Sequence, residues 1–304
     1  MDTFHCEHKL PHIARVAALP HDPDAPSVES GMPPYLIINW MVPDYPPSGM
    51  LAAKRTDGPG WHLVIYCRLS DAVRSMLRDG TSSQMPSIEL ARRYMSPSEG
   101  VALRGERLKC IFGAAGKQSL APFGAVLKQM LTRYNFRPFL SRTASLCYTG
   151  ASPSGQPYFE IDIDIHSWGN TALSAFGTVK HRIGQMAIRG GLVLEAVDDG
   201  EMPEQILGGC IYLLRIDPQR ATAFPADLAQ YLSATQTEPL LRGVYKCGKG
   251  DSGDGVVSSD RETSVTPPSL SPPCLSPRDQ AEEGAAQMPS LHLAVDEPPP
   301  TMRH

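Results

Sequence analysis

The amino-acid sequence predicts an α+β protein, in which a mainly antiparallel sheet packs against a few amphipathic helices. Apolar, β-branched and aromatic runs recur along the chain, as is typical of strands. Only a few segments between them have the spacing or the composition of helices. The strands and helices do not alternate in a regular βαβ series, so a doubly wound parallel sheet is not expected.

Two apolar runs near the start are the strongest strand candidates. They are YLIINWMV (35–42) and WHLVIYCRL (61–69), and a segment rich in turn residues separates them. We therefore expect them to be neighbours in the sheet. RLKCIFG (107–113) and residues 144–148 are weaker strand candidates. GLVLEAV (191–197) and GGCIYLLRI (208–216) are also strand-like.

The segment PYFEIDIDIH (157–166) alternates apolar and polar residues, which predicts a strand with two different faces. One face carries Phe159, Ile161, Ile163 and Ile165, and the other carries Glu160, Asp162, Asp164 and His166. We expect the apolar face to anchor a central strand, and the acidic face to meet water, a groove or the basic helices. An Asp-x-Asp-x-His row also has the residue types of a hard or borderline cation site. No further His, Asp or Glu cluster nearby in sequence completes a coordination shell, so metal binding is the less favoured alternative.

Two segments are predicted to be helices. In residues 122–134, apolar side chains recur at helical spacing. This stripe consists of Phe123, Val126, Leu127, Met130, Leu131 and Tyr134. The second helix is expected to begin at Asn170, a favourable N-cap, and to end near Arg189. Because glycine is costly inside a helix, its Gly177 and Gly184 indicate close packing against a strand.

The sequence after residue 245 differs from the rest of the chain. It is rich in Pro, Ser and Gly and poor in bulky apolar residues, so burial cannot offset the entropy lost on ordering it. We expect a single domain over residues 1–245 and a disordered tail over 246–304. Thr266, Ser271 and Ser276 each precede a proline and suit phosphorylation or partner binding, although a tail that acts only as a flexible extension is the commoner case.

Composition gives limited information on the cellular compartment. No run of about 18 apolar residues occurs, and the first residues lack the apolar core of a secretory signal. The 7 cysteines are scattered without a C-x-x-C pair, which favours reduced thiols over disulfides or a cysteine zinc site. We therefore expect an intracellular, cytoplasmic protein.

Charged residues are distributed unevenly along the chain. Residues 101–145 contain eight Lys or Arg and one acid, Glu106, whereas residues 191–206 contain five acids and no base. A concentrated basic face attracts anionic lipid headgroups or other polyanions. The candidate lipid- or anion-binding residues are Lys109, Lys117, Lys128, Arg133, Arg137 and Arg142. The alternative is that these bases solvate helix faces and pair with the acidic segment.

Two other kinds of site are disfavoured. GAAGKQS (113–119) resembles a phosphate-binding loop, but Ile111 and Gln118 replace the first glycine and the magnesium-binding Ser or Thr. No recognised nucleic-acid motif accompanies the basic residues, so a nucleic acid is not expected as a partner. Neither a catalytic residue nor a cofactor is predicted.

Several stretches taken together resemble one family. In order they are PPYLIINWMVPDYP, WHLVIYCRL, ERLKCIFG, NFRPFLSRTASLCY, PYFEIDIDI and MPEQILGGCIYLLRID. Over residues 4–217 the pattern is similar to that of the C-terminal domain of the plant protein enhanced disease resistance 2. KLPHIARV also resembles the family's short segment before the first of these strands. The family domain usually begins earlier, so we expect part of it, such as an edge strand, to be missing from this sequence.

The resemblance implies a context of lipid and membrane biology, because in plants the domain is typically attached to pleckstrin-homology and lipid-binding START domains. It supplies no catalytic residue, and the family usually has a small residue where His166 stands, which weakens the metal alternative. Sequence and resemblance together favour a non-enzymatic lipid-associated or regulatory binding module, cytoplasmic or peripheral on membranes. The alternatives are a metal-dependent enzyme using Asp162, Asp164 and His166, and a protein-interaction scaffold acting through the tail.

Overall fold

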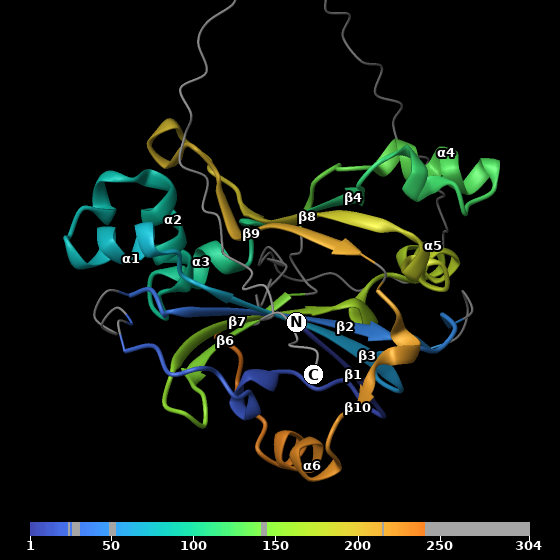
Figure 1. Cartoon of the computed structure of the whole chain (residues 1–304), viewed down its shortest axis with the longest axis horizontal. Helices are drawn as coiled ribbons and strands as arrows, with labels where there is room; N and C mark the ends of the chain where they lie inside the picture. Colours follow the sequence, from blue (N-terminus) through green and yellow to red (C-terminus); the bar gives the residue numbers. More distant parts are fainter. Residues whose placement is uncertain (24, 26–30, 49–52, 141–144, 215, 241–304) are drawn as a thin grey trace, which may run out of the picture. The chain divides into compact units, whose positions relative to one another are not determined.

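Two β-sheets face each other in the structure, a computed structural model, and one hydrophobic core fills the space between them (Figure 1). The structure describes residues 1–23, 25, 31–48, 53–140, 145–214 and 216–240. Arg142 and the tail predicted for 246–304, with its proposed partner motifs, lie outside these residues.

The larger sheet has six strands in the order β10-β1-β3-β2-β7-β6. They are β1 (Asp2–Cys6), β2 (Tyr35–Pro43), β3 (Gly60–Arg68), β6 (Ser145–Ala151), β7 (Pro157–Asp164) and β10 (Thr222–Ala223). Neighbours run antiparallel except for β2 with β7 and β1 with β10. The expected pairing of 35–42 with 61–69 is confirmed as β2 beside β3.

The smaller sheet is antiparallel throughout and has the order β5-β4-β8-β9. Its strands are β4 (Leu108–Ala114), β5 (Phe139–Leu140), β8 (Ala187–Leu194) and β9 (Gln205–Leu214). Leu108, Leu192 and Leu207 on its inner face belong to the same core cluster as Ile38 and Phe159 of the larger sheet. The predicted class, α+β with a mainly antiparallel sheet, is therefore confirmed.

The described helices are α1 (Asp71–Arg78), α2 (Pro86–Met95), α3 (Gly100–Arg104), α4 (Ala125–Tyr134), α5 (Asn170–Lys180) and α6 (Ala226–Ala234). α1, α2 and α3 lie together at one end of the two sheets, and α4 and α5 lie at the other end (Figure 1). The sequence-based prediction omits α2, although its Leu90 and Tyr94 are buried in the core. None of the described helices is long and apolar enough to cross a bilayer.

The helix predicted for 170–189 is shorter than expected. α5 ends at Lys180, and the residues from Ala187 onward form β8 because they pair with both β4 and β9. The predicted N-cap is also wrong by one residue. Gly169 occupies the N-cap position, and Asn170 is the first residue of the helix.

The two glycines assigned to that helix have different surroundings. Gly184 lies outside α5, in the short turn η6 (Ile183–Gln185), where an added Cβ atom would lie 2.8 Å from the backbone oxygen of Ile216. Close packing is therefore real at this position. At Gly177 an added Cβ atom meets no atom within 4 Å, so the expectation of close packing is wrong there.

The predicted stripe of α4 is only partly buried. Phe123, Leu127 and Leu131 pack in a small apolar cluster with residues of β4, α5 and β8. Val126, in contrast, is 85% exposed, so it does not belong to the buried face. The side chains of Met130 and Tyr134 lie outside the described part of the structure.

Candidate functional site

The acidic row of β7 is buried, so the expectation that it meets water, a groove or the basic helices is wrong. Glu160, Asp162 and Asp164 are 0%, 0% and 5% exposed. The opposite face packs as expected, because Phe159 and Ile161 belong to the main core. Buried carboxylates require hydrogen-bond donors from the protein, since charge is costly to remove from water.

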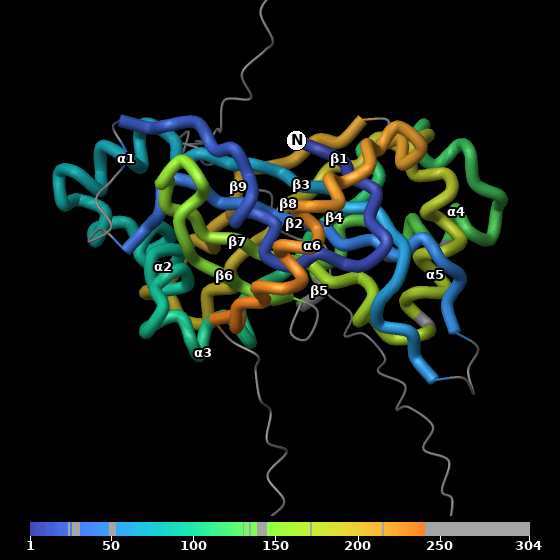
Figure 2. The backbone as a smooth tube through the Cα atoms, turned by 90° about the horizontal axis from the view of Figure 1, so that it is seen from below, coloured from blue at the N-terminus to red at the C-terminus, as the bar shows by residue number. Residues whose placement is uncertain are grey.

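The donors for Glu160 come from the N-terminal segment, residues 8–16, which crosses the row and lies beside α6 in Figure 2. The backbone N–H groups of Ile13 and Ala14 donate to the two oxygens of Glu160 at 2.9 and 3.0 Å. These groups open the short helical turn η1 (Ile13–Val16) and have no acceptor within it. Glu160 therefore caps this turn from a distant strand.

The next two carboxylates also bind the N-terminal segment, although Oδ1 of Asp164 is buried with no hydrogen-bond partner among the described residues. Asp162 accepts the backbone N–H of His12 at 2.8 Å and the side-chain amide of Asn39 at 3.0 Å. Asp164 forms an ion pair with Lys9, with 2.8 Å between Nζ and Oδ2. The whole row thus binds one segment of the chain, and we assign it a structural role.

Electrostatics agrees with a structural role. Burial, with the neighbouring Asp162, raises the pKa of Glu160 well above its usual range, and burial raises the pKa of Asp162 to about 6. Two carboxylates this close in a water-poor interior resist carrying two charges. The pair therefore holds a proton up to a higher pH than two isolated carboxyl groups would, which reduces the cost of burying it.

His62 holds the N-terminal segment from the side of β3. Its Nε2 accepts the backbone N–H of Leu10 at 3.3 Å, and its Nδ1 lies 2.9 Å from Oδ1 of Asn39. The amide of Asn39 donates to Asp162 and to the carbonyl of Leu10, so Oδ1 is the acceptor and Nδ1 carries the proton. Burial lowers the pKa of His62 to about 3, and the ring is neutral.

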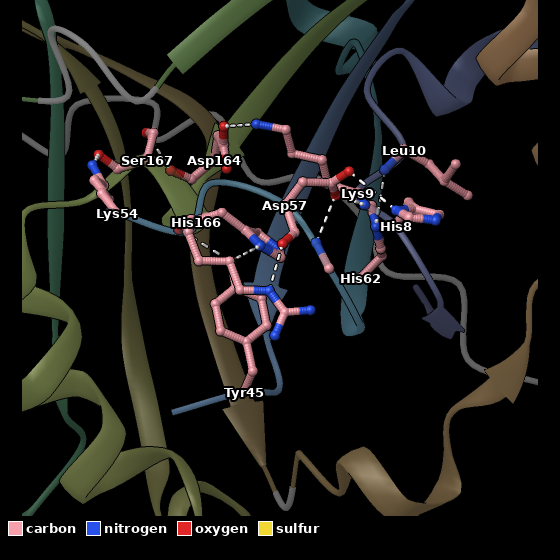
Figure 3. Close-up of polar contacts among 12 residues, drawn as sticks. His8, Lys9, Leu10, Tyr45, Lys54, Asp57, His62, Asp164, His166 and Ser167 are labelled. Carbon is pink, nitrogen blue, oxygen red and sulfur yellow. Dashed lines mark hydrogen bonds and ion pairs between the residues drawn. The ribbon is translucent and has the colours of Figure 1, made fainter. Parts of the chain in front are cut away.

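His166 does not continue the acidic row, contrary to the sequence-based prediction. It lies in the short turn η5 (Ile165–Ser167) that follows β7, and its Nδ1 is 2.8 Å from the hydroxyl oxygen of Tyr45 (Figure 3). Among the residues described, no group of three or more His, Cys, Asp or Glu side chains is arranged to hold a metal ion. The row formed by Asp162, Asp164 and His166 is therefore not a metal site in this arrangement.

The basic region divides into two groups, and in the first the charge is paired within the molecule. Nζ of Lys109 lies 3.1 Å from Glu195 and 2.9 Å from Glu204. Arg107 lies 3.1 Å from Glu201. Lys109 and Arg107 therefore pair with the acidic segment, which is the alternative stated in the sequence analysis. Two carboxylates therefore neutralise Lys109, one of the candidate anion-binding residues.

The second group surrounds α4. It consists of Lys117, Lys128, Arg133 and Arg137, all named as candidate lipid- or anion-binding residues, together with Arg182 and Arg189, and all are exposed. We refer to these six residues as the α4 surface. α4, α5 and β8 contribute to one apolar cluster, which holds these elements together. Within the described ranges, none of the six side chains forms an ion pair with a carboxylate.

The sequence explains why the α4 surface has no carboxylate partner among the described residues. No Asp or Glu occurs in residues 107–159 or in residues 165–194, the two stretches that build this side of the protein. Arg182 and Arg189 come from the second stretch and are absent from the sequence-based prediction, because the basic stretch over 101–145 ends before them. The absence of acids from both stretches is the signal that could have found them.

Comparison with known protein families gives a match over residues 1–217, to the family described as Protein ENHANCED DISEASE RESISTANCE 2, C-terminal. The chain belongs to this family. The resemblance noted in the sequence is thereby confirmed, and the match includes the acidic row, the N-terminal segment and the α4 surface. No curated protein and no solved structure matches the chain.

The hollows of this member of the enhanced disease resistance 2 family offer weaker candidates. An apolar cavity between β2, α2 and β9 measures about 50 Å³. Small-molecule sites are typically about 300–1,000 Å³. A polar hollow of about 670 Å³ lies beside the end of α5, but its Lys180 pairs with Asp44 and its Arg220 with Asp217. Because its positive and negative side chains are balanced, this hollow favours neither an anionic nor a cationic ligand. The α4 surface is therefore the stronger candidate.

Proposed function

We propose that this domain is a non-enzymatic binding module that recognises anionic lipid headgroups at a membrane surface through the α4 surface. The observation that carries the proposal is the group of six exposed bases on a side of the protein built from acid-free stretches. In this proposal the protein works in the cytoplasm, because the cytoplasmic leaflet is the anionic one.

The magnitude of the attraction supports a reversible, peripheral association. Each Lys or Arg near an anionic membrane surface contributes about 1 kcal/mol. Paired bases such as Lys109 contribute less, because a neighbouring carboxylate already neutralises them. The unpaired bases of the α4 surface therefore supply most of the binding free energy in this proposal.

A matched pair of double variants tests the proposal by co-sedimentation with lipid vesicles. Lys128→Ala with Arg133→Ala removes two charges from the α4 surface. Arg78→Ala with Arg220→Ala removes two exposed charges elsewhere. We expect the first variant to bind anionic vesicles about 30-fold more weakly and the second to bind nearly as well as the wild type. Equal losses in both variants, or no loss in the first, would overturn the proposal.

A further inference from the structure

The outer face of the smaller sheet carries exposed apolar side chains beside the α4 surface. Tyr212 and Leu214 of β9 are 54% and 62% exposed, whereas Leu213 between them is buried. Side chains alternate along a strand, so Tyr212 and Leu214 point outward together. β9 is also the edge strand of its sheet in the described fold.

Strand register places these side chains in line with the α4 surface. Arg189 of β8 lies directly between Gly113 of β4 and Tyr212 of β9. Neighbouring residues in register project from the same face of a sheet. Arg189 and Tyr212 are therefore adjacent on one face.

The turn after α4 identifies that face as the outer one. A Cβ atom added to Gly113 would lie 2.4 Å from Oδ1 of Asn135 and 2.9 Å from the backbone nitrogen of Phe136, the residues that follow the helix. The guanidinium of Arg189 lies 5.2 Å from the ring centroid of Phe136. The end of α4, Arg189 and Tyr212 thus share one side of the smaller sheet, the side on which α4 lies in Figure 1.

α4 adds an apolar side chain of its own. Val126 is 85% exposed and lies seven residues before Arg133, which places both on one face of the helix, about two turns apart. Valine, tyrosine and leucine side chains exposed next to unpaired bases are the combination found on proteins that lie at the bilayer interface. Tyrosine in particular is enriched at the headgroup level, because its ring is apolar and its hydroxyl is polar.

We propose that the outer face of the smaller sheet continues the membrane-binding surface, and that Tyr212, Leu214 and Val126 enter the interfacial layer of an anionic bilayer. This inference rests on the proposed function and adds the orientation of the protein on the membrane. The charge of the face argues for a membrane and against a second copy of the chain, because two such basic surfaces repel each other.

The opposite end of the same sheet provides a contrast. There Val197 and Met202 are 68% and 52% exposed, but they lie in the hairpin that carries Glu195 and Glu204. Acidic side chains are repelled by an anionic bilayer. The apolar residues of this hairpin are therefore a matched control for those beside Arg189.

Two variants of the full chain test the inference in vesicle co-sedimentation. Tyr212→Ser with Leu214→Ser is expected to weaken binding to anionic vesicles about tenfold while keeping its dependence on anionic lipid. Val197→Ser with Met202→Ser is expected to bind as the wild type does. Equal binding by both variants would overturn the inference. It would also be overturned if the Tyr212 and Leu214 substitutions left vesicle binding unchanged and instead converted a dimer of the wild-type chain into a monomer.

A probe on Cys210 separates this inference from the proposed function. Cys210 is exposed and lies two residues before Tyr212 on β9, whereas Cys67, Cys110 and Cys147 are buried. An environment-sensitive fluorophore is attached to it after Cys6, Cys247 and Cys274 have been replaced by Ser. A blue shift on binding anionic vesicles supports the inference. Binding without a shift overturns the inference but not the proposed function, and an absence of binding overturns both.

Discussion

The carboxylate of Glu160 accepts the backbone N–H of Ile13 at 2.9 Å, across 147 positions of the sequence. This contact explains the acidic strand that the sequence makes conspicuous. The carboxylates of β7 hold the N-terminal segment by its backbone amides and by Lys9. Loss of this anchoring is predicted to affect stability before it affects any surface interaction.

Two substitutions at Glu160 have different expected effects. Glu160→Ala leaves the N–H groups of Ile13 and Ala14 buried without an acceptor, and we expect it to reduce the free energy of unfolding by about 3 kcal/mol. Glu160→Gln keeps an acceptor for only one of the two N–H groups and places its own amide NH2 against the other, so an intermediate loss of about 1–2 kcal/mol is expected. Denaturant unfolding measures both. Asp71→Ala, at an 87% exposed side chain, is the control. A Glu160→Ala variant as stable as the Asp71→Ala control would contradict the structural role assigned to Glu160.

The stability of the protein is predicted to depend on His62 at acidic pH. Burial lowers its pKa to about 3, whereas the pKa in the unfolded chain is about 6.5. Between these values the unfolded state binds a proton that the folded state does not, so stability falls as the pH falls below about 6.5. Protonation of Nε2 would also remove the acceptor for Leu10.

The variant His62→Gln isolates this contribution. Its free energy of unfolding should depend less steeply on pH than that of the wild type, by up to about 1.4 kcal/mol per pH unit between about pH 4 and about pH 6. Asp162 acts in the opposite direction, because its pKa is raised in the folded state, but it is unchanged in the variant. Identical slopes for the wild type and the variant would show that His62 does not titrate in this way.

The two glycines near α5 make a matched pair. Gly177→Ala is expected to raise the free energy of unfolding by up to about 1 kcal/mol, because alanine favours a helix and the added Cβ atom meets nothing. Gly184→Ala is expected to lower it by about 1–3 kcal/mol, because the Cβ atom would press on the backbone oxygen of Ile216. Thermal or denaturant unfolding measures the free energy of unfolding of both variants. Changes of the same sign would contradict the described surroundings of Gly177 or of Gly184.

Arg104 and Lys128 are both basic residues of the same region, yet they should behave in opposite ways. The buried guanidinium of Arg104 donates to the carbonyls of Tyr94, Ser96 and Pro97. Arg104→Ala is expected to cost about 3 kcal/mol of stability without weakening vesicle binding of the folded protein. Lys128→Ala is expected to change stability by less than about 0.5 kcal/mol and to weaken vesicle binding. The reverse pattern would contradict the buried, structural placement of Arg104 and the exposed placement of Lys128 on the α4 surface.

The strands were predictable because their signal is local. The runs in β2, β3 and β7 are apolar at the positions that the core requires, whatever lies opposite them. The end of α5 was not predictable from periodicity. Residues 187–189 continue a helical pattern in sequence, but in the structure they belong to β8, which pairs with β4 and β9.

The surroundings of the acidic row could not be predicted from the row itself. Alternation shows that Glu160, Asp162 and Asp164 share a face, but their partners lie about 150 positions away and bind mostly through backbone amides, which carry no sequence signal. The α4 surface was partly predictable, because unpaired charge requires an absence of acids, which the sequence does show. Only the structure separates Lys109 from Lys128, since pairing depends on where the acidic hairpin lies.

The most direct test of the central claim is the binding of the unmodified chain to vesicles of increasing anionic lipid content, measured at two salt concentrations. The account predicts negligible binding to neutral vesicles, and binding that rises with anionic lipid. It also predicts that binding is largely lost between about 0.1 M and about 1 M salt, where the screening length falls from about 10 Å to about 3 Å. Binding that is absent on anionic vesicles, or equal on neutral and anionic vesicles, would contradict the account.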